Sequence, residues 1–203
     1  MIVLKKRSDY LDDKSGGDGL KGTIIRIFSK NARNCDKGRH GEDSIVEVLQ
    51  SLDDYCYLIN DIILPSSRGN IDHVPLTPKG IFAIETKNWE GEIICHGDEW
   101  HRRYHKGFFS SKDFDSGSPS RQVKTSAFNL SKLIETRLFH SAFRIWVDGL
   151  VVFTNPGVHL ELHDPSITVL RINELYNYLI NLRQMEKLSK KDIESIAKFI
   201  AIM

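Results

Sequence analysis

Two acidic residues and a lysine are spaced so that they could share one face of a β-hairpin. Asp72 lies in one short strand-like run, Glu85 lies in the next, and Lys87 follows Glu85 by two residues. Because side chains alternate along a strand, Lys87 is expected on the face that carries Glu85. Carboxylate oxygens are hard ligands that suit Mg²⁺ or Mn²⁺. The pattern indicates a metal site, and the alternative is a solvated strand edge that carries three charges.

The register of this hairpin decides whether the two acids meet. The connection Thr77–Gly80 has Pro in its second place and Gly in its fourth, as a type I turn prefers. A two-residue tip pairs Asp72 with Glu85, whereas a three-residue tip with a bulge pairs Asp72 with Thr86. Opposed like charges cost roughly 0.2–1 kcal/mol on an open sheet. A bound divalent cation would remove that cost, so a metal site favours the first register.

The elements that would position these residues follow from hydrophobic spacing. Apolar residues recur at helical spacing over 42–53, and an apolar stripe marks a second helix over 120–139. Further strands are expected at 57–64, 71–76, 81–87, 92–95, 100–104, 145–153 and 167–170, a mobile loop at 106–120, and further helices at 173–182 and 189–202. The order α-β-β-β-α-β predicts a mixed α+β fold with a central mixed sheet flanked by helices.

Composition limits the class of protein. A chain of 203 residues fits one domain with appendages. Its net charge of +1 gives no general basic signal, so a nucleic-acid surface would have to be a local patch. The cysteines Cys35, Cys56 and Cys95 are odd in number and lack CxxC spacing, which is typical of reduced thiols. No apolar run approaches the roughly 18 residues that span a bilayer. We therefore expect a cytoplasmic protein without a membrane partner.

Glu42 is a further acidic candidate near the start of the first helix. It precedes Ile45 by three residues and Leu49 by seven, so it belongs to the stripe that faces the core. An acid in the first turn complements the helix dipole by about 0.3–1 kcal/mol, and this structural role alone could explain it. Its place on the inward stripe slightly favours a functional role.

Residues across the middle of the chain also match one known pattern in order. The matching segments are Gly41-Glu42, Asn70-Ile71-Asp72-His73, Gly80-Ile81-Phe82, Ile84-Glu85-Thr86-Lys87-Asn88-Trp89 with Gly91, and Pro119-Ser120-Arg121-Gln122. Together they resemble the nuclease-related domain (NERD) family, which is grouped with the PD-(D/E)XK phosphodiesterases of the restriction-endonuclease type. An ExK motif alone is a weak signal, but the whole series is specific. One departure is Ser118-Pro119, where the family tends to have Asn-Pro.

The resemblance implies a restriction-endonuclease-like core and metal-dependent hydrolysis of phosphodiester bonds in nucleic acid, DNA in preference to RNA. Asp72 and Glu85 would be ligands of Mg²⁺ or Mn²⁺, and Glu42 would correspond to the acid of the family's first helix. Lys87 would be the catalytic lysine. Gln122 would correspond to the polar residue of the later helix.

Other residues are candidates for contact with nucleic acid. Arg121, Lys124 and Lys132 could meet backbone phosphates, although charges on a helix are more often its solvated face. Trp89 and Trp100 could stack on bases, although aromatic residues at strand ends more often pack.

We expect three regions: an arm at 1–37, the nuclease-related core at 38–170 and a helical extension at 171–203. A homodimer is possible, since many double-strand cutters are dimers. Two alternatives to an active nuclease stay open. One is a nucleic-acid-binding module with the same fold but no turnover, and the other is a scaffold that binds partner proteins.

Overall fold

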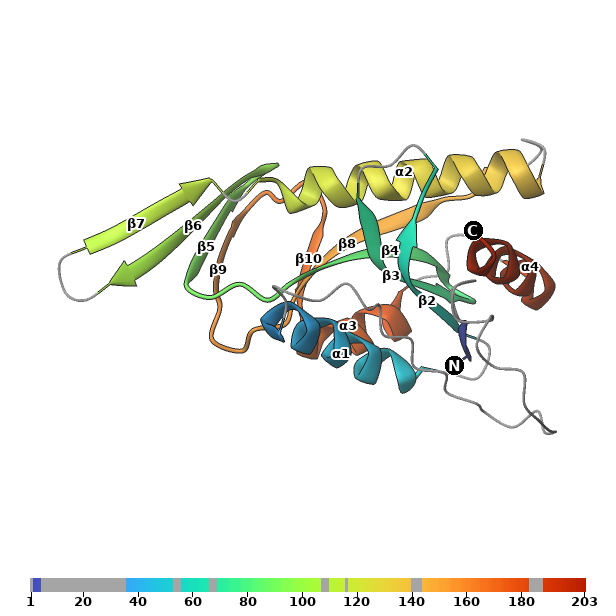
Figure 1. Ribbon diagram of the computed structural model, residues 1–203, viewed down its shortest axis with the longest axis horizontal. Helices are drawn as coiled ribbons and strands as arrows, with labels where there is room; N and C mark the ends of the chain where they lie inside the picture. The colour runs from blue at the N-terminus through green and yellow to red at the C-terminus, as the bar shows by residue number, and fades with distance from the viewer. Residues whose placement is uncertain are drawn as a thin grey trace.

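The computed structural model describes residues 2–4, 36–52, 56–65, 69–106, 110–115, 117–139, 144–182 and 188–203 (Figure 1). Within these residues the elements are β1 (Ile2–Leu4), α1 (Asp36–Gln50), β2 (Tyr57–Ile63), β3 (Asn70–Thr77), β4 (Gly80–Lys87), β5 (Glu92–His96), β6 (Glu99–Lys106), β7 (Ser110–Asp115), α2 (Pro119–Leu138), β8 (Val147–Phe153), β9 (His159–His163), β10 (Thr168–Arg171), α3 (Ile172–Asn181) and α4 (Lys190–Ala201). The predicted mixed α+β class and the order α-β-β-β-α-β are confirmed, and both are consistent with a restriction-endonuclease-like core.

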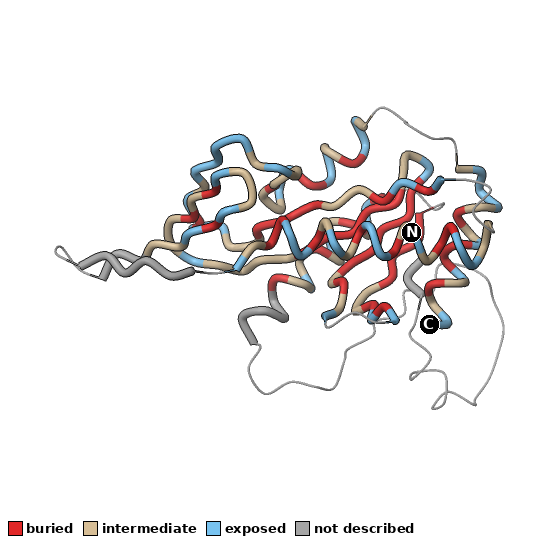
Figure 2. The backbone as a smooth tube through the Cα atoms, turned by 90° about the horizontal axis from the view of Figure 1, so that it is seen from above, coloured by how far each residue is buried: buried red, intermediate tan, exposed pale blue. Residues whose placement is uncertain are grey.

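The larger sheet is mixed and has the strand order β1-β2-β3-β4-β8-β10 within the described part of the chain. Strands β2, β3 and β4 are antiparallel neighbours, whereas β8 runs parallel to β4. Helices cover both faces, with α2 and α4 on one and α1 and α3 on the other (Figure 1). Because β4 and β8 are central and covered on both faces, they read as nearly continuous apolar runs. Figure 2 shows the buried residues concentrated in the middle of the fold.

The β3–β4 hairpin has the register that brings the two acids together. Leu76 pairs with Ile81, and Thr77 pairs with Gly80, so the tip contains two residues. The Thr77 hydroxyl accepts a hydrogen bond from the Lys79 amide at 3.1 Å and donates to the Gly80 carbonyl at 3.2 Å. Extending this register to the open end of the hairpin places Asp72 opposite Glu85. The three-residue tip is therefore excluded.

A second sheet, with the order β7-β6-β5-β9 among the described residues, was not predicted. The expectation of a loop over 106–120 is wrong for Ser110–Asp115, which pairs with β6 as an antiparallel strand. Strand β9 was also missed, because four of its five residues are exposed and it has no apolar pattern. It pairs in parallel with β5. The β6–β7 hairpin projects away from the helices (Figure 1).

Helix α2 connects the two sheets. Its N-cap is Ser118, whose side chain accepts a hydrogen bond from the Arg121 amide at 3.2 Å, and Pro119 occupies its first turn. Its buried stripe includes Val123 and Leu130 and packs on the larger sheet, as the spacing predicts. Helix α1 begins six residues before the predicted start, at Asp36.

The terminal regions are described only in part. Most of the predicted arm at 1–37 lies outside the described residues, but Ile2–Leu4 forms β1 and pairs in parallel with β2. At the other end, Ser189 and Asp192 form the capping box expected for the last helix. None of the helices in the described ranges is long and apolar enough to cross a membrane.

Candidate active site

The candidate site lies at the end of β4, where the open end of the β3–β4 hairpin meets the first turn of α2. Asp72 Oδ2 accepts a hydrogen bond from the Thr86 backbone amide at 2.8 Å, which ties β3 to β4 at the level of the acids. Glu85 is only 4% exposed. Two carboxylates therefore lie close together in a largely buried position, which is unfavourable for their negative charge.

Glu85 is held by two further predicted residues. The Lys87 ammonium donates a hydrogen bond to Glu85 Oε1 in a charge-paired contact. On the other side, Gln122 Nε2 donates to Glu85 Oε2 at 2.7 Å. Lys87 reaches Glu85 because the two residues share one face of β4, and Gln122 reaches it because α2 packs on that face. The structure thus brings together Asp72, Glu85, Lys87 and Gln122.

Electrostatics show that this cluster resists full ionisation. Burial, and then the neighbouring Glu85 carboxylate, raise the pKa of Asp72 to about 7, although the Thr86 amide opposes the shift. Burial also raises the pKa of Glu85, against the lowering effects of Lys87 and of the Gln122 amide. Near neutral pH, added positive charge would therefore stabilise the ionised forms of these two carboxylates.

Glu42 reaches the cluster from the opposite layer of the fold. Its charge is close enough to add to the rise in the pKa of Asp72. The preceding residue makes this approach possible, because a Cβ on Gly41 would lie 2.6 Å from Thr154 Oγ1 and 3.2 Å from Asn88 Cβ. The second turn of α1 therefore lies directly against the residues that follow β4 and β8.

Two contributions to the site depend on the backbone, and the pattern of residue types does not reveal them. They are the Thr86 amide that binds Asp72 and the missing Cβ of Gly41. The sequence contains a Gly-Glu pair, which lies in the second turn of α1, but only the position of Thr154 shows why the glycine is needed.

The donor set agrees with a hard divalent cation. In the described ranges, no three side chains of His, Cys, Asp or Glu are grouped closely enough to hold a metal by themselves. Mg²⁺, however, is usually bound by one or two carboxylates with waters and substrate phosphates as the other ligands. The opposed pair Asp72 and Glu85, with raised pKa values, fits that type of site.

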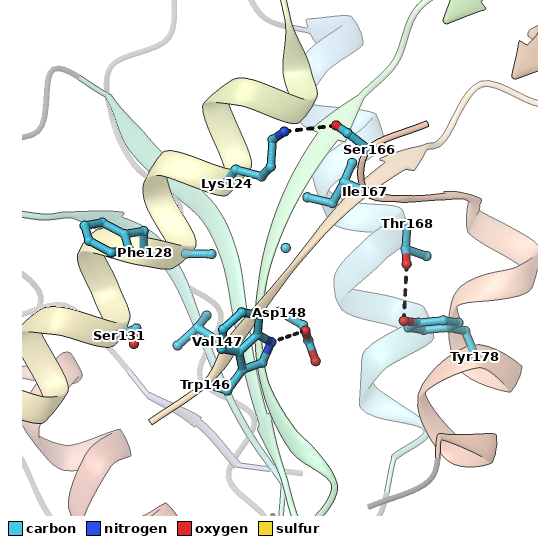
Figure 3. A pocket seen from close by; sticks show the side chains of 12 residues that line it. Lys124, Phe128, Ser131, Trp146, Val147, Asp148, Ser166, Ile167, Thr168 and Tyr178 are labelled. Carbon is cyan, nitrogen blue, oxygen red and sulfur yellow. Dashed lines mark hydrogen bonds between the residues drawn. The ribbon is translucent and has the colours of Figure 1, made fainter. Parts of the chain in front are cut away.

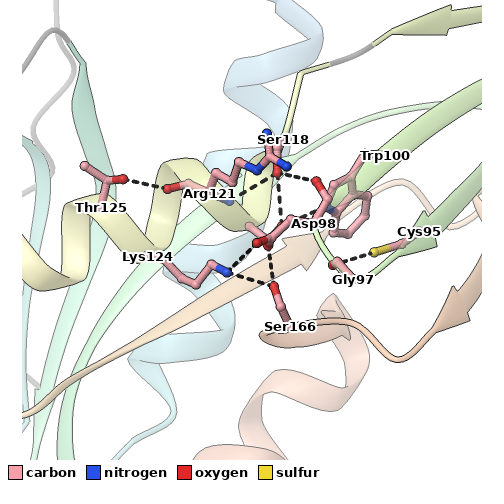
Figure 4. A network of polar contacts seen from close by, with 10 residues as sticks. Cys95, Gly97, Asp98, Trp100, Ser118, Arg121, Lys124, Thr125 and Ser166 are labelled. Atoms are coloured by element: carbon pink, nitrogen blue, oxygen red, sulfur yellow. Dashed lines mark hydrogen bonds and ion pairs between the residues drawn. The ribbon is translucent and has the colours of Figure 1, made fainter.

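The three candidate nucleic-acid contacts lie along α2 and are differently placed. Lys124 Nζ lies 2.6 Å from Asp98 Oδ2 and 3.0 Å from Ser166 Oγ (Figure 4). Lys132 Nζ lies 2.8 Å from Glu135 Oε2. Arg121 is exposed beside Gln122 and borders a pocket of about 350 Å³. The structure places Arg121 beside the β5–β6 turn and pairs the two lysines with carboxylates. Their binding to nucleic acid stays a prediction.

Trp100 packs in the interior. It is buried, it stacks on Phe153 with ring centroids 5.9 Å apart, and its indole nitrogen donates to Ser120 Oγ at 2.9 Å. The packing role is confirmed for this residue. Trp89 is only partly buried and lies beside Lys87, whose ammonium is 5.7 Å from the ring centroid.

A separate pocket of about 380 Å³ opens between α2, the start of β8 and β10 (Figure 3). Its lining includes Phe128 and Trp146, whose exposed fractions are 63% and 68%. Among the predicted site residues only Lys124 borders it. This pocket is therefore distinct from the acidic cluster.

Comparison with known proteins agrees with the geometry. The model of the nuclease-related domain family matches residues 37–154, more than half of the chain and a range that contains every predicted site residue. An uncharacterised protein of Bacillus anthracis is 34% identical over 80 residues, which is 37% of this chain and 37% of that protein. The match thus spans little more than a third of that relative's length. No solved structure matches the chain. The chain belongs to the nuclease-related domain family.

Proposed function

We propose that this protein is a metal-dependent nuclease that hydrolyses phosphodiester bonds, with DNA as its substrate. The observation that carries the proposal is the convergence of Asp72, Glu85, Lys87 and Gln122 at one end of β4. The preference for DNA comes from the family's place among the restriction-endonuclease-like enzymes.

The acidic residues would hold the cofactor. Asp72, Glu85 and Glu42 would bind Mg²⁺ or Mn²⁺, because their carboxylates are hard donors and two of them have raised pKa values. When bound, such an ion polarises a phosphate and lowers the pKa of a coordinated water. The Thr86 amide fixes Asp72 Oδ2, so one donor is already oriented.

Lys87 and Gln122 would act on the reacting phosphate and water. Hydrolysis develops negative charge on the phosphate oxygens, and the Lys87 ammonium is placed to neutralise it beside Glu85. The Gln122 side chain donates to Glu85 through Nε2, while its carbonyl oxygen has the chemistry to accept a hydrogen bond from the attacking water.

The direct test is cleavage of labelled plasmid, linear and single-stranded DNA with Mg²⁺ or Mn²⁺. Glu85→Gln keeps the size of the side chain but removes its charge, so we expect cleavage to be lost. Glu194→Gln is a matched control on α4, where Glu194 forms an exposed pair with Lys198. Equal cleavage by wild type and Glu85→Gln would contradict the proposal.

A second candidate function has its own support. Both oxygens of Glu85 are engaged, by Lys87 and by Gln122, and the described side chains do not form a group of three acids around a metal position. These contacts favour a nucleic-acid-binding module without turnover. DNA binding by the wild-type protein with no cleavage in either metal would support this alternative.

A further inference from the structure

Two cations approach the ring of Trp89, and only one of them belongs to the acidic cluster. Lys87 Nζ lies 5.7 Å from the ring centroid, and Arg102 Cζ lies 5.6 Å from it. Trp89 is in the link between β4 and β5, which joins the larger sheet to the smaller one. The candidate catalytic lysine and an arginine of the smaller sheet therefore both approach the same ring.

The ring is held in place by the interior of the protein. Trp89 contacts Phe153 edge-on, with centroids 5.9 Å apart and an interplanar angle of 68°. Phe153 is 1% exposed and stacks in turn on the buried Trp100. Because Trp89 packs on Phe153, which packs in turn on Trp100, the interior supports the ring beside the two cations.

Arg102 is also positioned. Its Nε donates to the Glu90 carbonyl at 3.0 Å, and the side chain is half-buried. Burial lowers the pKa of Arg102, but an arginine remains charged in proteins. Its planar guanidinium carries five N–H donors in a geometry that matches phosphate oxygens.

The neighbouring arginine on β6 has a different role. Arg103 NH1 lies 3.0 Å from Glu92 Oε2, and the two residues are paired across β5 and β6. Successive side chains of a strand point to opposite faces, so Arg103 faces away from Trp89. Arg102 and Arg103 thus have the same charge and adjacent positions but different surroundings.

We propose that Arg102, held beside Trp89, binds a backbone phosphate within a few nucleotides of the phosphate that reacts. This inference rests on the proposed function and extends it. Both cations lie within 6 Å of one ring centroid. One strand rises about 3.4 Å per nucleotide, so a polynucleotide can bridge them within a few nucleotides. The bound strand would run from the acidic cluster towards β6.

The test is DNA binding without a divalent cation. A fluorescein-labelled single-stranded oligonucleotide is titrated with protein in EDTA over a series of KCl concentrations, and binding is followed by anisotropy. We expect Arg102→Ala to raise Kd several-fold and to reduce the slope of log K against log salt by about 0.7, the value for one phosphate contact on a single strand. Arg103→Ala should bind as wild type, and Arg102→Lys should keep the slope.

Each result decides the proposal. An unchanged slope in Arg102→Ala, an equal change in Arg103→Ala, or no binding by wild type even at low salt would overturn it. Circular dichroism and thermal unfolding of each variant identify a loss of fold. The readout needs no cleavage, so a protein that shows the Arg102 effect but never cuts DNA would disprove the nuclease and leave this binding site standing.

Discussion

Gly41 and Thr154 approach so closely that a Cβ on the glycine would lie 2.6 Å from Thr154 Oγ1. This contact fixes the second turn of α1 against the end of β8. Glu42 is the next residue in the chain, and its negative charge contributes to the raised pKa of Asp72. A helix packed on one face of the sheet thereby supplies an acid to a cluster that faces the other.

Gly41→Ala should therefore disturb both stability and the site. Alanine in a helix interior is normally favoured over glycine by roughly 0.5–1 kcal/mol, but overpacking typically costs about 1–3 kcal/mol. Because Thr154 is β-branched and stiff at χ1, and Asn88 Cβ would also lie only 3.2 Å away, we expect the steric cost to prevail. Urea unfolding should show a net loss of stability.

Two variants control this experiment. Gly69→Ala introduces a Cβ that meets nothing within 4 Å, so its effect should be small. Adding Thr154→Ala to Gly41→Ala removes the oxygen at the closest contact and should restore part of the stability. If Gly41→Ala alone were more stable than wild type, the predicted clash with Thr154 would be wrong.

Asp72→Asn should stabilise the protein at alkaline pH when no divalent cation is present. Burial and Glu85 raise the pKa of Asp72 from 3.8 to about 7. The folded state thus binds a proton more tightly than the unfolded state, and Asp72 destabilises the fold increasingly as pH rises from about 4 to 7. Each unit of pKa shift is worth about 1.4 kcal/mol, so the gain is on the order of a few kcal/mol.

Urea unfolding at pH 5 and pH 8 measures this effect. The advantage of Asp72→Asn over wild type should be larger at pH 8, because the wild-type carboxylate is then charged. Asp192→Asn is the opposite control, since it removes a negative charge from the first turn of α4, where the helix dipole favours one, and should destabilise at pH 8. A constant difference between Asp72→Asn and wild type would show that Asp72 does not titrate between these pH values.

Binding of Mg²⁺ or Mn²⁺ should strengthen as pH rises through about 7. The cation requires the Asp72 carboxylate, and the proton competes with it up to the raised pKa of that group. Isothermal calorimetry in buffers of different ionisation enthalpy should detect proton release at pH 6.5 and little at pH 8.5. Asp72→Asn should abolish that release, and the same release in the variant would assign it to another group.

Lys87→Ala should lose cleavage while it keeps the fold and metal binding. The ammonium is expected to stabilise charge that develops during hydrolysis, and loss of one such group typically reduces the rate about 10²–10³-fold. Cleavage assays combined with calorimetric metal titration separate the two properties. Lys198→Ala is a control, because Lys198 forms an exposed pair with Glu194 on α4. Undiminished cleavage by Lys87→Ala would remove this lysine from the mechanism.

Much of the β3–β4 hairpin could be predicted from local sequence. The turn residues of Thr77–Gly80 allowed two registers, and the chemistry of opposed carboxylates favoured the one that the structure has, in which Asp72 lies opposite Glu85. The helical spacing of α2 also gave its buried stripe. The contact of Gln122 with Glu85 joins residues 37 positions apart, and only the family resemblance indicated it.

The smaller sheet could not be predicted in the same way. Ser110–Asp115 has a composition typical of a loop, and it becomes a strand because β6 offers hydrogen-bonding partners. His159–His163 is mostly exposed and pairs with β5 from more than 60 residues away. Such strands depend on non-local pairing, which a periodicity of apolar residues does not reveal.

Asp98, in the β5–β6 turn, connects this smaller sheet to the helix that bears Gln122. Its backbone carbonyl accepts from the Ser118 hydroxyl at 2.7 Å, and its carboxylate binds Lys124 and the Ser166 hydroxyl. These contacts hold the pKa of Asp98 well below its usual range, chiefly through Lys124. The two sheets are therefore fastened at the first turns of α2 and should share one melting transition. A shortened chain without the smaller sheet would lose the Asp98 contacts that hold the first turns of α2, and with them the position of Gln122 beside Glu85.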